Sequence, residues 1–223
     1  MTLGYGSTAF GFKDQILEDG PGIDDAFQNL EFAFARYLAD ILYSTCVGAD
    51  GIDAELPGPA RMLDLFKTLA TRRVEKGEKL SWTVPVTNFP VVQQYTSPVS
   101  KRIQFRYLGE TLKLTIQIRE ETLLDKRKQK SSAAPNIVHS FDAGHLAMTV
   151  NECDYPISTV HDSWGSTPGD MSDLFETVRE QFVEFNERDP LALLLSGENA
   201  SDLMPTRGSL DVSTVLESDF AFA

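Results

Sequence analysis

The sequence predicts an α+β fold, and two kinds of side-chain pattern indicate it. Apolar residues recur at steps of three and four in several stretches, which is typical of amphipathic helices. Residues 101–119 instead alternate polar with apolar and break at Leu108-Gly109-Glu110, which is typical of a β-hairpin. A chain of 223 residues with 42% hydrophobic and 24% charged content is long and apolar enough for one or two cored domains.

Helices dominate the first third of the chain. Residues 1–19 are expected to begin as a turn and continue as a short helix, because three glycines lower the helix propensity there. Longer helices are predicted over 26–46 and 59–73. The stripe that should face the core on the first of them is Phe27, Leu30, Phe34, Leu38 and Ile41.

Strands and connections follow, and then two more helices. A short strand is predicted over 80–85, and a polar, solvated loop over 120–132. A helix over 135–151 should have Asn136 as its N-cap. The last long helix is expected to begin at Thr167-Pro168. Its apolar face should consist of Met171, Leu174, Phe175, Val178, Phe182 and Phe185.

Asp162 is the strongest candidate for a catalytic residue. It lies in Val160-His161-Asp162-Ser163-Trp164-Gly165, where we expect a short buried strand to end and a glycine to turn the chain. A carboxylate at the tip of such a rigid element suits a hard divalent ion such as Mg²⁺. His161, Asp162 and Ser163 are consecutive, so they cannot converge as a hydrolase triad. The alternative is a hydrogen-bonded turn with no chemistry.

The hairpin predicted over 101–119 is a candidate for binding nucleic acid. It carries five basic residues against Glu110, in a chain whose formal net charge is −13. A two-stranded ribbon fits the major groove of DNA, where Arg and Gln read guanine and adenine edges. The alternative is a solvated face, and the acidic chain as a whole argues against nucleic acid. The expected polar face consists of Arg102, Gln104, Arg106, Lys113, Gln117 and Arg119.

Other features limit the cofactors and the location. Cys46 and Cys153 form no CxxC pair, which argues against structural zinc and indicates a reducing compartment. No apolar run approaches the about 20 residues of a membrane span, so a soluble, cytoplasmic protein without a membrane partner is predicted. His139, Asp142 and His145 lie three residues apart and suggest a metal site, although a further ligand would have to come from a distant segment.

Four islands of the sequence resemble the C-terminal part of the single-subunit RNA polymerases of bacteriophages. They are Met1-Thr2-Leu3-Gly4-Tyr5-Gly6-Ser7 with Phe10-Gly11-Phe12, Pro135-Asn136-Ile137-Val138-His139-Ser140, His161-Asp162-Ser163-Trp164-Gly165 and Glu217-Ser218-Asp219-Phe220-Ala221-Phe222-Ala223. The islands follow the order of the family and cover nearly the whole chain. The resemblance implies part of a right-hand polymerase fold. It places the end of the fingers, with the hairpin, over 1–139, and the end of the palm, with a strand-turn-strand and a docked tail, over 140–223.

The resemblance also implies roles for single residues in nucleotide binding and catalysis. It implies that Tyr5, with Gly6 beside it, senses the ribose 2′-hydroxyl of the incoming nucleotide and that Phe10 contacts the template base. His139 is implied as a contact to the minor groove and the substrate sugar. Asp162 is implied as one of two aspartates that bind the catalytic metals, the other belonging to a segment that precedes these islands in the family.

Further implied positions surround the active site and the DNA. His161, Ser163, Phe222 and Ala223 are expected near the active site, and Ser163 replaces the second acid that related DNA polymerases tend to carry, which favours RNA synthesis. A hairpin in this place recognises the promoter in the family. Its implied DNA contacts are Arg102, Gln104, Arg106 and Lys113, with Leu112 and Leu114 standing where polar base readers would be expected.

These features predict the C-terminal part of a DNA-directed RNA polymerase that transcribes phage genes in the bacterial host cytoplasm. It would transfer nucleotidyl groups from ribonucleoside triphosphates by a two-metal mechanism with Mg²⁺, on a DNA template with a promoter. The isolated chain is expected to be inactive and to need a separate N-terminal portion, because one aspartate and the basic triphosphate ligands are absent from the sequence. The alternatives are a non-catalytic DNA-binding remnant and a remnant without activity.

Overall fold

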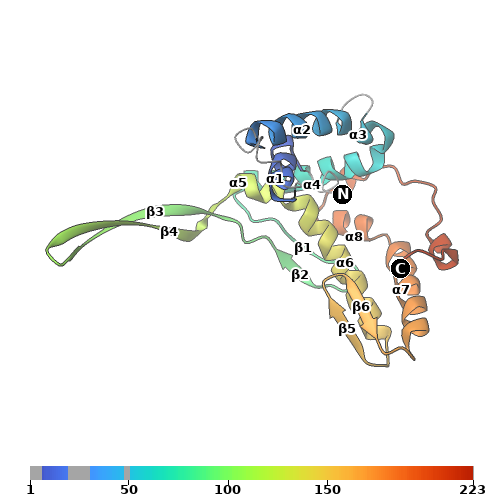
Figure 1. The fold of residues 1–223 in the computed structure, drawn as a ribbon. Coiled ribbons are helices and arrows are strands. Elements are labelled where there is room, and N and C mark those ends of the chain that lie inside the picture. The colour runs from blue at the N-terminus through green and yellow to red at the C-terminus, as the bar shows by residue number, and fades with distance from the viewer. Residues whose placement is uncertain (1–6, 20–30, 48–50, 223) are drawn as a thin grey trace. The chain divides into compact units, whose positions relative to one another are not determined.

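The computed structural model describes residues 7–19, 31–47 and 51–222 of the chain. These residues divide into two compact units, one within 1–66 and 202–211 and the other within 67–201 and 212–223. Runs of helices alternate with runs of strands along the chain. The described strands pair as three separate antiparallel hairpins (Figure 1). The mixture of helices and small sheets agrees with the predicted α+β class, and the right-hand polymerase arrangement remains a proposal.

The first unit is built on α1 (Ala9–Asp19), which packs against α2 (Glu31–Cys46). The short α3 (Ile52–Glu55) and the first turns of α4 (Pro57–Glu75) follow. The helix predicted over 59–73 is therefore confirmed and begins two residues earlier. None of the described helices is long and apolar enough to cross a membrane.

The apolar stripe predicted for α2 was wrong in part, since only Leu38 among its described members is half-buried. Phe34 and Ile41 are 48% and 42% exposed, whereas Ala35 and Ala39 are fully buried. Small side chains let a helix backbone approach its neighbour closely, so an alanine stripe can face the interior while the larger side chains point outward. Phe27 and Leu30 lie outside the described residues.

The second unit holds the hairpins and the remaining helices. Its elements after α4 are β1 (Ser81–Thr83), β2 (Pro90–Val92), β3 (Thr96–Tyr107), β4 (Glu110–Leu124), α5 (Lys126–Ser131), α6 (Ala133–Glu152), β5 (Ile157–Val160), β6 (Ser163–Ser166), α7 (Met171–Glu187), α8 (Pro190–Gly197) and the 3₁₀ turn η4 (Val212–Glu217). Another 3₁₀ turn, η3 (Ser201–Leu203), follows α8. The core of the second unit includes Leu80, Trp82, Val84, Ile137, Leu174, Val178, Phe185, Leu194 and Leu195.

Helices α6 and α7 pack against each other at Gly144. A Cβ atom at Gly144 would lie 3.0 Å from Phe185 Cε2 and 3.1 Å from Val84 Cγ1, so only glycine fits there without displacing a neighbour. This packing fixes α6, the helix that carries His139 and Asp142.

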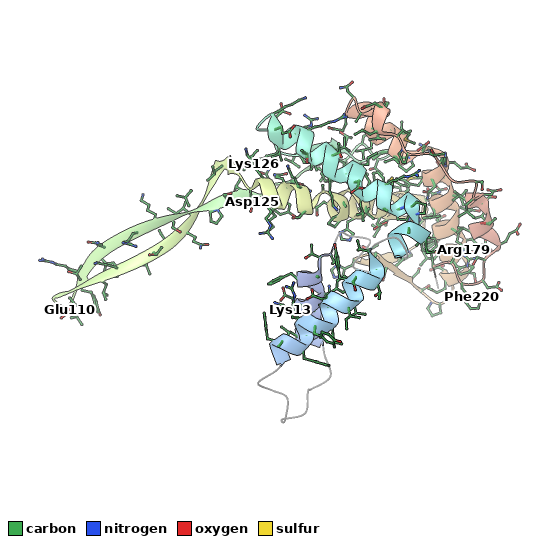
Figure 2. The ribbon with its side chains drawn as sticks, turned by 90° about the horizontal axis from the view of Figure 1, so that it is seen from above. Lys13, Glu110, Asp125, Lys126, Arg179 and Phe220 are labelled. Atoms are coloured by element: carbon green, nitrogen blue, oxygen red, sulfur yellow. The ribbon has the colours of Figure 1, made fainter. Side chains whose placement is uncertain are left out.

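The β3–β4 hairpin reaches away from the helices of the second unit (Figures 1 and 2). The predicted hairpin is confirmed, and it is longer than expected because pairing extends from Thr96 to Leu124. Leu108 and Gly109 form its two-residue loop with φ of 49° and 84°. Positive φ at both loop residues matches the right-handed twist of the flanking strands, and glycine adopts it without strain.

The solvated loop predicted over 120–132 was wrong. Strand β4 extends to Leu124, and α5 follows with Asp125 as its N-cap, whose carboxylate accepts a hydrogen bond of 2.9 Å from the Lys128 amide. Gln129 is fully buried, and its side chain bonds to the backbone of Leu80 and Gln93 at 3.2 and 3.0 Å. A buried amide whose bonds are satisfied in this way ties the root of the hairpin to the strands of the core.

Two predicted helix starts were also wrong. Helix α6 begins after Ser132, and Asn136 lies within its first turns, where its amide bonds to Tyr95 instead of capping the helix. Helix α7 begins at Met171, because Thr167 donates a hydrogen bond of 2.7 Å to the Asp170 side chain and closes a turn before the helix.

The face that α7 buries differs in part from the prediction. Leu174, Val178 and Phe185 are buried as expected, whereas Met171 and Phe175 are exposed. Arg179 and Gln181 are buried in their place, although both are polar. The arginine is held by the chain terminus, as described below.

Candidate functional site

Asp162 lies in the two-residue turn of the β5–β6 hairpin. Val160 pairs with Ser163, so His161 and Asp162 are the two residues that connect the strands. His161 has a φ of 57°, in the left-handed region where histidine is more common than most residues. The strand-turn-strand that the resemblance implied is therefore present, with Asp162 at its tip.

Two details of the prediction for this hairpin were wrong. Strand β5 is mostly exposed rather than buried, because the hairpin has only two strands and α7 contacts it through β6. Gly165 does not turn the chain, since it pairs with Ser158 inside β6. The exposure leaves the carboxylate of Asp162 accessible to a ligand.

Asp162 faces Asp142 of α6 across two adjoining cavities. One, of about 430 Å³, is also lined by His139 and His161, and the other, of about 380 Å³, by His145. Burial raises the pKa of Asp142 above its usual range, the nearby charge of Asp162 raises it further, and His139 opposes this change. Carboxylates are the hard oxygen ligands that Mg²⁺ prefers, and the exposed carboxylate of Asp162 is the one that this turn could offer to such an ion.

The metal site suggested by His139, Asp142 and His145 finds no support. Among the described residues, no three His, Cys, Asp or Glu side chains are placed to hold a metal ion. His145 is buried, and its Nε2 lies 2.8 Å from the Val178 carbonyl oxygen. Burial lowers the pKa of His145, so the ring is neutral at pH 7 and serves as packing. Asp142 lines the same two cavities as Asp162, and its i, i+3 spacing from His139 was the signal that Asp142 and His139 share a helix face.

The C-terminal tail docks on an aromatic cluster that includes the Asp162 hairpin. The Phe222 ring lies 5.5 Å from His145, 6.3 Å from Trp164 and 5.1 Å from Phe182, measured between ring centroids. Trp164 belongs to β6, so the tail contacts the strand that follows Asp162. Phe222 therefore lies docked on this cluster, and its expected place near an active site stays a prediction. Ala223 lies outside the described residues.

Arg179 of α7 holds the tail from the other side. Its Nε and Nη2 donate to the carbonyl oxygen of Ala221 at 3.2 and 3.0 Å. The guanidinium carbon lies 3.5 Å from the centroid of the Phe175 ring, which covers it. Two donors of one planar group meeting one acceptor fix the direction of the tail as well as its position.

The polar face predicted for the hairpin is confirmed by its register. Arg102 pairs with Thr115, Gln104 with Lys113 and Arg106 with Thr111, so these side chains share one face, and all are exposed. Lys101 lies on the opposite face by alternation. The opposite face also carries Ile103, Phe105, Leu112 and Leu114, which pair with one another.

This register explains why Leu112 and Leu114 are not polar. They pair with Phe105 and Ile103 on the apolar face, whereas Lys113 lies between them on the polar face. In this hairpin the second strand therefore offers Lys113, not its leucines, beside Arg102 and Gln104. The DNA contacts themselves remain a prediction.

The residues predicted to bind the nucleotide are described only in part. Tyr5 and Gly6 lie outside the described residues. Phe10 is 56% exposed on α1, and the buried Lys13 holds its ring with Nζ 3.8 Å from the centroid. His139 is exposed on α6 and lines the cavity that contains Asp162. Phe10 belongs to the first unit and His139 to the second.

Known proteins match the chain along its length. A family model described as DNA-dependent RNA polymerase matches residues 1–202. The chain is 36% identical to the DNA-directed RNA polymerase of Enterobacteria phage T3 and 35% identical to the T7 RNA polymerase of Escherichia phage T7. In both cases the match covers all of this chain and 28% of the relative. It is also 30% identical to the mitochondrial DNA-directed RNA polymerase 1 of Arabidopsis thaliana, covering 22% of that protein.

Proposed function

Because the chain belongs to the phage-type family of DNA-dependent RNA polymerases, we propose that it supplies the C-terminal part of such an enzyme. It would extend RNA on a DNA template from ribonucleoside triphosphates. The remaining part of the enzyme would come from a polypeptide that corresponds to the rest of the relatives, of which this chain spans 28%. The observation that carries the proposal is the exposed Asp162 at the tip of its hairpin, facing Asp142 beside His139.

Asp162 is proposed as the catalytic carboxylate of this chain. Bound Mg²⁺ would lower the pKa of the 3′-hydroxyl nucleophile and neutralise charge on the triphosphate. Asp162 would hold the ion through its exposed carboxylate, and the second aspartate would come from the preceding part of the polymerase. His139 would contact the substrate sugar from the same cavity. Because residue 163 is a serine, Asp162 is the one acid of this turn.

Tyr5 and Phe10 are proposed to bind the substrate and the template. Tyr5, with Gly6, would test the ribose 2′-hydroxyl, and Phe10 would contact the template base. Contact with Lys13 supports the second role, because Lys13 Nζ lies against the Phe10 ring while the residue as a whole stays 56% exposed.

The proposed function is tested by reconstitution. We would mix the purified chain with an N-terminal fragment of a relative, a promoter-bearing template, four ribonucleotides and Mg²⁺, and measure the RNA made. RNA from the mixture and from neither piece alone is the expected result. A complex that forms but makes no RNA would refute the catalytic proposal and leave the non-catalytic DNA-binding module as the better account.

The polar face of the hairpin is proposed to read the promoter. We expect Arg102→Ala to weaken binding to duplex promoter DNA by about 1–3 kcal/mol, because a bidentate Arg contact to a base edge is worth that much. Fluorescence anisotropy with a labelled duplex would measure it. The matched control is Lys101→Ala, the neighbouring cation on the apolar face, which should change the affinity much less. Equal losses in both variants would mean that only the charge of the hairpin matters.

A further inference from the structure

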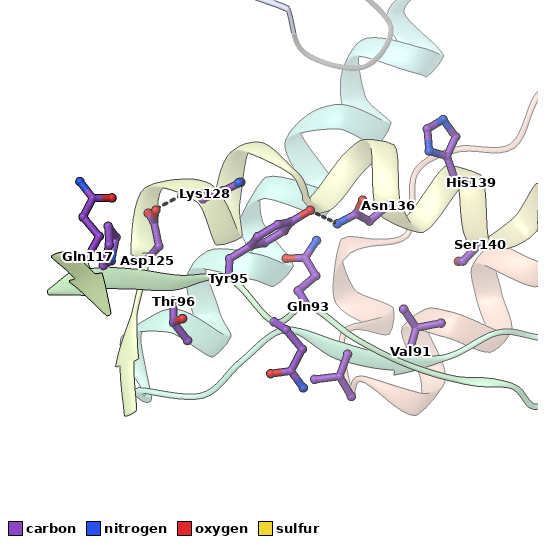
Figure 3. A pocket seen from close by; sticks show the side chains of 13 residues that line it. Val91, Gln93, Tyr95, Thr96, Gln117, Asp125, Lys128, Asn136, His139 and Ser140 are labelled. Atoms are coloured by element: carbon purple, nitrogen blue, oxygen red, sulfur yellow. Dashed lines mark hydrogen bonds between the residues drawn. The ribbon is translucent and has the colours of Figure 1, made fainter. Parts of the chain in front are cut away.

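A polar pocket of about 710 Å³ lies at the root of the hairpin (Figure 3). This volume is in the range of about 300–1,000 Å³ that is typical of sites for small ligands. Its polar lining comes from the segment between β2 and β3, from β3 and β4, and from α5 and α6. The residues that matter here are Gln93, Tyr95, Gln117, Lys128, Asn136 and His139.

The pocket opens on the polar face of the hairpin. Gln117 pairs with Ser100, which is two residues from Arg102 and therefore on the same face. Pro98, two residues before Ser100, also lines the pocket. A DNA strand bound along Arg106 and Arg102 would reach the pocket without crossing to the apolar face of the hairpin.

The pocket and the cavity of Asp162 share one lining residue. His139 lines both the pocket and the cavity that contains Asp142 and Asp162. The polar face, the pocket and the catalytic turn therefore follow one another within the second unit, with His139 between the last two.

The chemistry of the lining matches a nucleotide. The Asn136 amide donates to the Tyr95 hydroxyl at 3.2 Å, which holds the ring in place, and Lys128 Nζ lies 4.8 Å from the centroid of that ring. The Lys128 side chain is exposed beside that ring, where its ammonium can meet a phosphate. Amides and an aromatic ring next to a cation are the groups that bind an unpaired base and its backbone.

The buried Gln93 helps to fix the wall of the pocket. Gln93 is 3% exposed and donates through Nε2 to the Ser132 carbonyl oxygen at 3.0 Å. Its Oε1 is buried and has no hydrogen-bond partner among the described residues. This oxygen is sealed from solvent, so it belongs to the wall of the pocket and is not offered to a ligand in this conformation.

We infer that this pocket holds one unpaired nucleotide of the DNA strand that runs from the hairpin to Asp162. The inference rests on the proposed function, because it takes the hairpin as the duplex contact and Asp162 as the catalytic end. The pocket would separate the strand from its complement before the template reaches the catalytic turn. Its polar amides would favour some bases over others at this single position.

The test measures binding of the full chain to a fluorescein-labelled single-stranded DNA of about 12 nucleotides by anisotropy. Asn136→Ala should weaken single-strand binding about ten-fold, because stacking on Tyr95 loses its support. Lys128→Gln, at an exposed side chain, should lower the slope of log affinity against log salt by about 0.7, as expected for one lost phosphate contact. Lys76→Gln removes an exposed cation just after α4, outside the pocket, and is the matched control, expected to change neither quantity.

The outcomes separate this inference from the proposed function. Loss of single-strand binding in the two pocket variants, with duplex binding retained, would support the pocket. Single-strand binding that is unchanged in both variants, while Arg102→Ala still weakens duplex binding, would overturn the pocket alone. Absence of both kinds of binding in a folded chain would overturn the proposed function as well. If the same variants weaken only a single-stranded RNA of equal sequence, the assignment to DNA is wrong.

Discussion

Asp162→Asn should abolish RNA synthesis by the reconstituted polymerase. The amide keeps the size of the side chain but removes the charge that holds Mg²⁺, and a bound metal is worth several kcal/mol of transition-state stabilisation. We therefore expect a loss of about 10³-fold or more, since each 1.36 kcal/mol is ten-fold in rate. The RNA made in a fixed time from a promoter-bearing template would measure it.

The fold should not change in this variant, because Asp162 is exposed in its turn. Circular dichroism and thermal unfolding would verify that. The matched control is Asp154→Asn, another exposed aspartate, in the connection between α6 and β5, which should retain activity. Substantial incorporation by Asp162→Asn would refute the assignment of Asp162 as a metal ligand.

Phe222→Ala should both destabilise the second unit and impair activity. The ring packs against His145, Trp164 and Phe182, and full burial of a phenylalanine is worth about 3–5 kcal/mol. Because Phe222 is 43% exposed, we expect a loss of about 2 kcal/mol, seen as a fall in Tm of several degrees. Activity should fall about ten-fold or more, because Trp164 loses a contact that fixes the strand after Asp162.

Phe220 provides the control for this experiment. It is 85% exposed, lies two residues earlier in the same tail and has the same side chain. Phe220→Ala should leave the Tm of the chain nearly unchanged. If the two variants lower Tm equally, docking of Phe222 on the aromatic cluster is not what stabilises the chain.

Local patterns of the sequence predicted the elements well. Alternation and the Leu108-Gly109 loop were enough to predict the hairpin and its two faces, because strand periodicity depends only on neighbouring residues. The sequence did not predict where the strands end or that α5 forms. It also did not predict that α6 and α7 begin directly after Ser132 and Asp170. These depend on which buried group a side chain meets, such as Gln129 bonding to the strands of the core, and that is a property of tertiary contacts.

The candidate site was predicted in part for the same reason. Asp162 and the docked Phe222 came from motifs, whereas the role of Asp142 beside Asp162 required knowing that α6 faces the β5–β6 hairpin. Arg179 was missed because a buried arginine on an amphipathic helix looks like a solvated charge until the carbonyl of Ala221 is placed against it. The roles of Tyr5 and Phe10 came from the resemblance alone.

The alternation of the β3–β4 hairpin has a consequence for how such a protein evolves. Each side chain on the polar face can be exchanged without moving its neighbours on the apolar face, because adjacent residues of a strand point in opposite directions. A change at Arg102 or Gln104 therefore leaves the pairing of Ile103 with Leu114 intact. If the polar face reads DNA as we propose, its specificity can change one substitution at a time while the strand pairing of the hairpin is kept.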